Sequence, residues 1–327
     1  MAEYLTNTTD LTKVASAIRE KGGTSDSLVY PDGFVTAIGN IQTGVAKPKW
    51  TNATMPTSKC WTSVCYGNDK FVAVVDNSNI VDYSTDGINW TRGTLPVSKY
   101  WASVCYGNGK FVAIAKDTDI AAYSTDGINW TQTTMPGTRG WYRVCYGNGK
   151  FVAVCESGML PAYSTDGITW ISARMPDSGS WMSFCYGNGK FVAVSFGSTK
   201  VMYSTDGINW TQATLPVSAY WRSVCYGNGK FIAVSESPVA VYSTDGINWT
   251  QITMPADVYW TSVCYGNDKF VAVSYSFIVY STDGINWTQS TMPAKLNLFS
   301  VCYGKGKFVT LGNGVAAYLK DSFDEWE

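Results

Sequence analysis

The nonapeptide YSTDGINWT at residues 83–91 sets the architecture, because the chain repeats it almost letter for letter. Identical copies begin at Tyr123, Tyr203, Tyr242 and Tyr280, and a near copy, YSTDGITWI, begins at Tyr163. The Trp that closes each copy serves as a marker of the repeat, and the markers lie at Trp50, Trp90, Trp130, Trp170, Trp210, Trp249, Trp287 and Trp326. The spacings between successive markers are 40, 40, 40, 40, 39, 38 and 39 residues. This internal period predicts seven repeat units.

Each unit has the pattern of four short strands. The first strand is WxSVCYG, in which apolar and polar residues alternate, and the turn GNGK connects it to the second strand, KFVAV. A variable loop then leads to the third strand, xxYSTD, and a DG turn connects that strand to the fourth, INWTQTTMP. Asn-Gly and Asp-Gly supply the positive φ that tight hairpin turns need. Units of about 40 residues with four antiparallel strands are typical of β-propeller blades.

The two ends of the repeated region predict how the ring closes. The last unit ends as AAYLKDSFDEWE at its marker Trp, whereas KWTNATMP at residues 49–56 has the outer-strand pattern with no blade before it. We therefore expect this N-terminal strand to complete the last blade, built mainly from Leu298–Lys320, and so to remove an exposed edge. The predicted fold is all-β, a seven-bladed β-propeller of four-stranded antiparallel blades.

The heptad STDGINW resembles the Asp-box, or BNR repeat, of sialidases and many other propellers, although Gly follows Asp one residue sooner than usual. The resemblance covers six of the seven units. It implies a structural turn in which Asp and Ser bond to local backbone while Trp packs into the blade. The residue types agree, since Asp and Ser satisfy backbone donors in tight turns.

Residues 1–45 differ from the repeats and predict a small helical segment ahead of a propeller at 46–327. TDLTKVASAIREKGG has Thr9 or Asp10 as a candidate N-cap and Gly22 as a stop, and PDGFVTAIGNI indicates a second short helix. The segment resembles an N-terminal module of tail and baseplate-associated proteins of phages that infect Gram-positive bacteria. That resemblance implies attachment to other tail or virion proteins. The alternative is a helical cap on one end of the ring.

Composition limits the partners and the location. The net charge is −1 and the pI is about 5.6, so no basic surface is expected for nucleic acid. The N-terminus lacks the pattern of a signal peptide, and no apolar stretch is long enough for membrane insertion. With the tail resemblance, these features predict synthesis in a bacterial cytoplasm and a place in the virion tail.

The cysteines predict buried thiols rather than a disulfide framework or a metal site. Seven of the nine occupy the same position, in VCYG or its copy FCYG, and equivalent positions in successive blades lie too far apart to bridge. The chain has no CxxC pair and no His, so neither a metal nor a cofactor is expected.

Variation among the repeats predicts where a ligand binds. It concentrates after MP and after FVAV, and in a four-stranded blade these two segments emerge on one face. Tyr, Arg and Met are favoured at recognition surfaces, although drift in loops that contact nothing is the alternative. The expected ligand contacts are Tyr100, Tyr142, Arg143, Met182, Tyr220, Arg222 and Tyr259, with Trp101 and Trp221. These two belong to a set of strand-start Trp residues that either stack on sugars or wedge between blades.

We expect a non-enzymatic recognition domain of a phage tail, or receptor-binding protein, that contacts a host surface glycan or protein. No catalytic residue is assigned, because the arginine pattern of sialidases, a nucleophile elbow and a phosphate loop are missing. One alternative is a sialidase-like or other glycosidase, in which Asp117, Asp119, Glu156 and Glu236 would supply paired carboxylates. A second alternative is an intracellular scaffold for protein interactions.

Overall fold

A computed structural model describes residues 49–290 and 296–320. The chain divides into two compact units, Met1–Lys47 and Pro48–Glu327, where the sequence placed the boundary after residue 45. The helical segment expected within residues 1–45 lies outside the described residues. The described residues contain strands and turns but no helix, and accordingly none long and apolar enough to cross a membrane.

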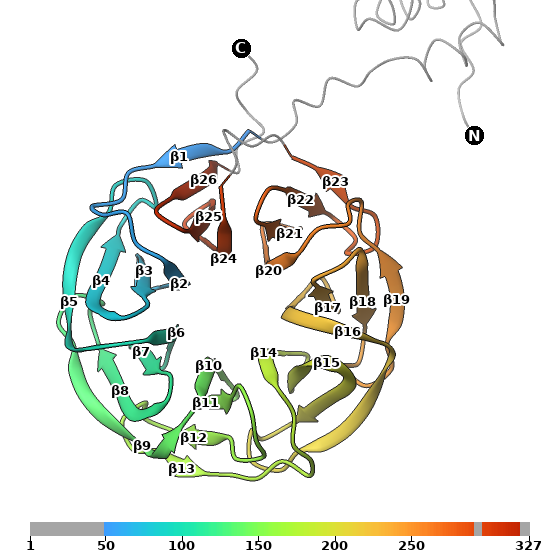
Figure 1. Cartoon of the computed structure of the whole chain (residues 1–327), viewed down its shortest axis with the longest axis horizontal. Helices are drawn as coiled ribbons and strands as arrows, with labels where there is room; N and C mark the ends of the chain where they lie inside the picture. Colours follow the sequence, from blue (N-terminus) through green and yellow to red (C-terminus); the bar gives the residue numbers. More distant parts are fainter. Residues whose placement is uncertain (1–48, 291–295, 321–327) are drawn as a thin grey trace, which may run out of the picture. The chain divides into compact units, whose positions relative to one another are not determined.

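The strands of the second unit form antiparallel sheets arranged around a centre, with the first strand of each repeat innermost (Figure 1). The three sheets that come first along the chain have four strands each: β2 (Trp61–Gly67), β3 (Lys70–Val75), β4 (Ser78–Ser84) and β5 (Thr91–Lys99); β6 (Trp101–Gly107), β7 (Lys110–Ala115), β8 (Thr118–Ser124) and β9 (Thr131–Arg139); β10 (Trp141–Gly147), β11 (Lys150–Cys155), β12 (Ala162–Ser164) and β13 (Ile171–Ser172).

The remaining strands form one larger sheet and two further four-stranded sheets. They are β14 (Trp181–Gly187), β15 (Lys190–Ser204), β16 (Thr211–Gly227), β17 (Lys230–Ser235), β18 (Val239–Ser243) and β19 (Thr250–Thr253); β20 (Trp260–Gly266), β21 (Lys269–Ser274), β22 (Ile278–Ser281) and β23 (Thr288–Gln289); β24 (Leu298–Gly304), β25 (Lys307–Gly312) and β26 (Ala316–Lys320) with β1 (Thr51–Ala53).

The prediction of seven separate four-stranded blades was wrong, because the described strands form six sheets, five of four strands and one of six. The six-stranded sheet contains two repeat units. Its strand β16 runs without a break from an outer position, paired with β15, to an inner position, paired with β17. The pair Ser198↔Ala219 has counterparts in Ser78↔Lys99 and Thr118↔Arg139, and the further pair Phe196↔Tyr220 makes β16 continuous. The rings of Phe196 and Tyr220 stack at 4.7 Å.

The predicted closure by the N-terminal strand is confirmed. β1 pairs antiparallel with β26, with Thr51 opposite Tyr318 and Ala53 opposite Ala316, and the final sheet has the order β1-β26-β25-β24. The inner strands β2, β6, β10, β14, β16, β20 and β24 contact one another in this order, and β24 contacts β2. The ring of sheets is therefore closed, and the architecture is a β-propeller.

The hydrophobic core lies between neighbouring sheets. Val72 and Val74 of β3 pack in one cluster with Trp101, Phe111 and Ala113 of the next sheet. Because each sheet is covered on both faces, the KFVAV strands read as continuous apolar runs rather than alternating ones, and Phe71, Val72, Ala73 and Val74 are all fully buried.

The CYG tripeptide is held constant by close packing between repeat units. A Cβ added at Gly107 would lie 2.0 Å from the Cγ atom of Tyr146 in the following unit, and the other glycines of this motif meet the corresponding Tyr in the same way. No side chain fits at that distance, so Gly is required wherever the next inner strand presents its ring.

The STDG turn makes the same hydrogen bonds in six units. In the second unit, the backbone N–H of Gly127 donates to Ser124 Oγ at 2.9 Å, and the N–H groups of Ile128 and Asn129 donate to Asp126 Oδ1 at 2.8 Å. Gly127 has a φ of 75°, which a residue with a side chain rarely adopts. Desolvation opposes the charge of Asp126, but these amide donors lower the pKa of its carboxyl well below the usual range. The repeated Asp is thus a turn-forming residue.

Candidate functional site

Two faces of the propeller can be distinguished by which loops emerge on them. On the face that we call the constant-turn face, the GN turn of five units bonds to the STDG turn of the next unit; for example, Asn108 Nδ2 donates to the Thr165 carbonyl at 3.3 Å. The series continues across the closure, where Lys305 Nζ donates to the Thr85 carbonyl at 3.0 Å. The constant turns therefore meet on one side of the ring.

The opposite side, which we call the variable face, carries the segments that differ between units. In six units the backbone N–H of the residue that follows the KFVAV-type segment donates to the carbonyl of the residue before the conserved Trp or Leu of the inner strand, so both variable segments meet there. Lys116 N donates to the Tyr100 carbonyl at 2.8 Å, and Glu156 N donates to the Gly140 carbonyl at 2.7 Å. The expectation that both variable segments share one face is confirmed by these bonds.

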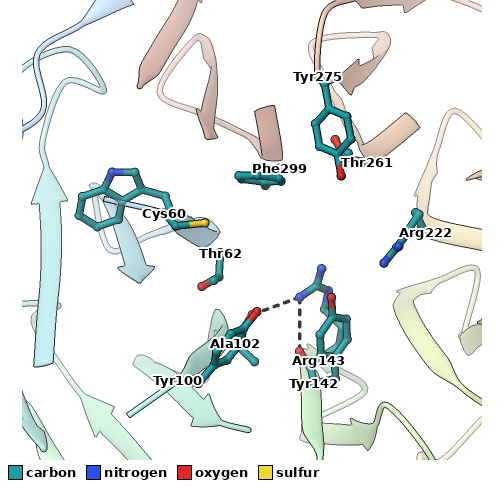
Figure 2. Close-up of a pocket in the computed structure, with 11 residues that line it drawn as sticks. Cys60, Thr62, Tyr100, Ala102, Tyr142, Arg143, Arg222, Thr261, Tyr275 and Phe299 are labelled. Carbon is teal, nitrogen blue, oxygen red and sulfur yellow. Dashed lines mark hydrogen bonds between the residues drawn. The ribbon is translucent and has the colours of Figure 1, made fainter. Parts of the chain in front are cut away.

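A pocket of about 220 Å³ opens at the centre of the variable face, where the inner strands begin (Figure 2). Its walls come from residues at or just before the start of β2, β6, β10, β20 and β24, from the inner half of β16 and from the residue after β21. The lining residues are Cys60, Trp61, Thr62, Tyr100, Ala102, Tyr142, Arg143, Arg222, Thr261, Tyr275 and Phe299. Four predicted ligand contacts, Tyr100, Tyr142, Arg143 and Arg222, are thus brought together.

Arg143 interrupts a ring of serines. At the equivalent position of the other units, Ser Oγ accepts a hydrogen bond from a backbone N–H of the neighbouring inner strand, at 3.1 to 3.3 Å. The serines are Ser63, Ser103, Ser183, Ser223, Ser262 and Ser300. Arg143 instead extends its guanidinium, whose Nη1 donates to the Ala102 carbonyl at 3.1 Å and lies within 3.4 Å of the Tyr142 carbonyl. Its Cζ lies 4.5 Å from the centre of the Tyr142 ring.

Arg222, the second cation of the lining, and Lys116 beside it are paired with carboxylates. Arg222 forms an ion pair with Glu236, to which its Nε also donates at 2.5 Å, and its Cζ lies 4.6 Å from the centre of the Phe196 ring. Lys116 forms an ion pair with Glu156. No carboxylate is among the residues that line the pocket. The lining therefore carries a net positive charge at Arg143.

A chain of aromatic rings leads from the rim into the pocket. Tyr259 meets Tyr275 with ring centroids 6.2 Å apart, and Tyr275 meets Phe299 at 5.7 Å, both edge to face. Tyr220 and Tyr259 are 56% and 55% exposed, although neither lines the pocket. In Figure 2, Phe299 and Tyr275 lie across the space from Tyr100 and Tyr142.

Three predicted ligand contacts require correction. Trp101 and Trp221 are fully buried, and their indole Nε1 atoms donate to the carbonyls of Val97 and Ser198, at 3.2 and 2.9 Å. Their ring faces are unavailable to a sugar, so these residues wedge between sheets, which was the alternative interpretation. Met182 is only 5% exposed and lies outside the pocket lining.

Sequence reasoning missed several lining residues as site members, although the signal was present. Tyr275 follows β21 in a variable loop, and Phe299 follows the first residue of β24. Thr62 and Thr261 hold neighbouring inner strands, since their hydroxyls contact the carbonyls of Trp101 and Leu298 at 2.6 and 2.8 Å. Thr62, Thr261 and Phe299 each stand at the second residue of an inner strand, a position that varies among the units, and Tyr275 stands in the variable loop after a second strand.

A second, more open depression of about 460 Å³ lies beside Tyr100. Its lining is polar and consists of Asn77, Ser98, Lys99, Tyr100, Lys116 and Asp117. The rings of Tyr100 and Tyr142 lie 5.9 and 5.8 Å from Lys116 Nζ. Burial, followed by the neighbouring Tyr142, raises the pKa of Tyr100, so its hydroxyl remains a hydrogen-bond donor at neutral pH.

The cysteines and two of the four candidate catalytic carboxylates are held in other roles. All nine cysteines are free, and burial raises the pKa of the Cys105 thiol well above its usual value, so it stays protonated and unreactive. Of the four carboxylates considered for a glycosidase, Glu156 and Glu236 are tied in ion pairs. Within residues 49–290 and 296–320, no cluster of Cys, Asp and Glu could hold a metal ion.

Comparisons with known proteins identify the fold. No protein-family model matches the chain, and no curated protein matches it. Among solved structures, a streptogramin B lyase is 12% identical with a TM-score of 0.74, and the match covers 83% of this chain and 96% of that one. A catalytically inactive virginiamycin B lyase from Staphylococcus aureus with quinupristin is 11% identical, with a TM-score of 0.75 and coverages of 83% and 98%.

A third similar structure is YCF48 bound to D1 peptide, which is 15% identical with a TM-score of 0.69 and coverages of 85% and 98%. At these identities the likeness shows the propeller fold alone.

Proposed function

We propose that this propeller is a non-enzymatic recognition domain that binds a surface glycan or protein of a host cell through its variable face. The observation that carries the proposal is where the exposed apolar side chains lie. Among the described residues, five large hydrophobic side chains are exposed, and four of them, Leu160, Tyr220, Tyr259 and Tyr275, belong to variable segments. Exposed aromatic rings grouped on one face are typical of interaction surfaces.

The rigidity of the ring supports this role. The variable segments stand on inner strands whose first residues, such as Trp101 and Trp141, are fully buried. A rigid framework that carries diverse loops keeps the entropy cost of binding low. The alternative, drift in loops without contacts, does not account for rings such as Tyr259 and Tyr275 that pack on each other while remaining exposed.

We also propose that the protein belongs to a phage tail or a related particle. Support comes from the resemblance of the stretch from Leu11 to Ile41 to modules of tail and baseplate-associated proteins. In that setting residues 1–45 would attach the propeller to other virion proteins. The variable face would then meet the host, and the mature protein would reside in the virion after synthesis in the bacterial cytoplasm.

An enzyme is the main rival, since propellers of similar fold include lyases. Against it stand the absence of His from the chain and the pairing of Glu156 and Glu236 with cations. A peptide-binding scaffold is the second rival, because a similar propeller is known bound to a peptide. Sialidase, glycosidase and lyase assays on the purified protein would expose the first rival, and a peptide array the second.

The direct test is binding of the full-length protein to a glycan array and to intact Gram-positive cells. A Tyr220→Ala/Tyr259→Ala variant should lose most of this binding while unfolding at the parent's temperature. A matched variant on the opposite side, Asn108→Ala, should bind as the parent does. Equal binding by the parent and the tyrosine variant would remove the variable face from the site, and turnover of a glycan would replace the proposal with an enzyme.

A further inference from the structure

We infer that the pocket at the centre of the variable face takes the anionic group of an acidic sugar unit, and that Arg143 binds that group. The inference rests on the proposed function and narrows its ligand class. It depends on three features of the pocket, namely the position of Arg143, the charges around it and the shape of its walls.

The position of Arg143 is the first feature. Six units have Ser at this place, and each Ser ties two inner strands together through its Oγ. In the third unit the Ser is replaced by an arginine that lines the pocket. With Arg at this position, the hydrogen bond that the Ser makes in every other unit is lost, and a guanidinium lies in the pocket. A bound ligand explains this difference better than packing does.

The charges are the second feature. Arg222 and Lys116 have carboxylate partners, whereas none of the described ion pairs includes Arg143. Its guanidinium is held in place by the Ala102 carbonyl through Nη1 and by the Tyr142 ring. A planar guanidinium with donors to spare and no acidic neighbour in the lining is suited to a carboxylate or a phosphate oxygen pair.

The shape and walls are the third feature. A volume of about 220 Å³ is below the range for drug-sized ligands, roughly 300–1,000 Å³, and suits a single sugar ring. The rings of Tyr100, Tyr142, Tyr275 and Phe299 line this space. Aromatic faces pack on the apolar C–H face of a sugar, and tyrosine hydroxyls bond to its hydroxyl groups. An anion without a ring would leave these walls unused.

The test compares sugars that differ only in charge. Glucuronic acid, glucose 1-phosphate and glucose would be titrated into the full-length protein, with chemical shifts or calorimetry as the readout. Glucuronic acid or glucose 1-phosphate should bind at least tenfold more tightly than glucose, since a charge-assisted bond is worth about one factor of ten or more. The two acidic sugars also separate a carboxylate from a phosphate ligand. Binding should weaken as salt is raised.

The decisive variant is Arg143→Ser, which restores the residue found in the other six units and should therefore fold. It should lose the preference for acidic sugars and bind glucose as the parent does. Arg174→Ser, at an exposed position on the outside of the ring, is the control and should keep the preference. Arg143→Gln provides a second variant if the serine variant unfolds.

The outcomes separate this inference from the proposed function. Equal affinity for glucose and both acidic sugars, or an unchanged preference in Arg143→Ser, would overturn the inference. If the protein binds cells or neutral glycans through Tyr220 and Tyr259 but ignores acidic sugars, the inference fails while the proposed function stands. If it binds no cell, glycan or protein surface, the proposed function itself fails.

Discussion

The constant-turn face and the variable face are built from the same repeat units, but the units share their residues and hydrogen bonds on the first face and differ in their side chains on the second. On the first, Asp Oδ1 accepts the N–H of the second residue after it at 2.8 Å in six units, from Ile88 to Ile285. On the second, equivalent positions carry Thr62, Ala102, Tyr142, Met182 and Arg222. Interactions that stabilise the fold therefore lie where the units have the same sequence, and side chains that could contact a ligand lie where the sequences differ. Substitutions can test this division, because they should act on folding in one region and on binding in the other.

The largest effect is expected for Trp101→Ala, just beneath the variable face. The ring is fully buried and packs with Val72, Val74 and Phe111 of two sheets. Its loss should lower the free energy of unfolding by about 3–5 kcal/mol, the range for truncating a buried Trp. Chemical denaturation measures this. A loss of ligand binding with unchanged stability would instead show that Trp101 is a ligand contact, and the two faces would then not differ as described.

The substitution Asp82→Ala is expected to raise the free energy of unfolding by about 2–3 kcal/mol at neutral pH. Asp82 departs from the repeat pattern, but it lies in the core rather than on the variable face. Its side chain is fully buried, and neither carboxylate oxygen has a hydrogen-bond partner. Arg92 Nε lies 3.8 Å away. Burial raises the pKa of Asp82 to about 6, and Arg92 offsets this only in part. Equivalent positions carry Ala122 and Ala162.

The pH dependence of Asp82 follows from the sign of that shift. Because the folded pKa is raised, the protonated carboxyl stabilises the fold below its unfolded pKa, near 4, and this stability is lost as pH rises through about 6. The parent should lose about 2.5 kcal/mol relative to Asp82→Ala between pH 4 and pH 7.5. Denaturation curves at several pH values measure the difference. Parallel curves for the two proteins would show that Asp82 does not titrate in this window.

A smaller cost, about 1 kcal/mol, is expected for Asp126→Ala on the constant-turn face. The change removes the acceptor for the N–H groups of Ile128 and Asn129, much as the loss of a helix cap does. Because the folded pKa of Asp126 is lowered, its contribution is present above the unfolded pKa and is lost as pH falls. Asp126→Asn, which keeps one acceptor oxygen, should recover part of the loss. Melting temperatures at pH 7 suffice, and binding should be unaffected.

The smallest effect on stability, below about 1 kcal/mol, is expected for Tyr220→Ala combined with Tyr259→Ala, which removes one partly exposed ring contact each, with Phe196 and Tyr275. Both rings are more than half exposed, so little buried area is lost. A drop in melting temperature comparable to that of Trp101→Ala would mean that the variable face also carries the fold. The comparison between the two faces would then collapse.

Much of this architecture was accessible from the repeats. The strand order within a unit, the closing strand at residues 51–53 and the turn role of Asp126 follow from local rules of hairpins and edges. The fusion of two units through β16 was not predictable, because it depends on the backbone pair Phe196↔Tyr220 beside a loop whose sequence is unique. The number of repeats in the sequence gives the number of units, whereas the backbone hydrogen bonds determine whether two units form one sheet or two.

The candidate site was predicted less well. Arg143, Tyr100, Tyr142 and Arg222 were placed together correctly, but Trp101 and Trp221 were misassigned, because a residue type alone does not tell which ring face packing will cover. The interruption of the serine ring was visible in the sequence at position 143, yet the bond that each Ser makes appears only in three dimensions. The Asp82 and Arg92 pair was missed for a similar reason, since cross-strand register unites them.

The short strand β1 gives the propeller an unusual mechanical property. It contributes three residue pairs to the last sheet, and the chain before it leads directly to residues 1–48. A pull on that leading segment would load the β1–β26 ladder before any other part of the ring. These few backbone bonds would act as a latch whose release frees the rim of one sheet while the remaining sheets stay assembled. Force spectroscopy from the N-terminus should record an early, small extension ahead of the main unfolding event.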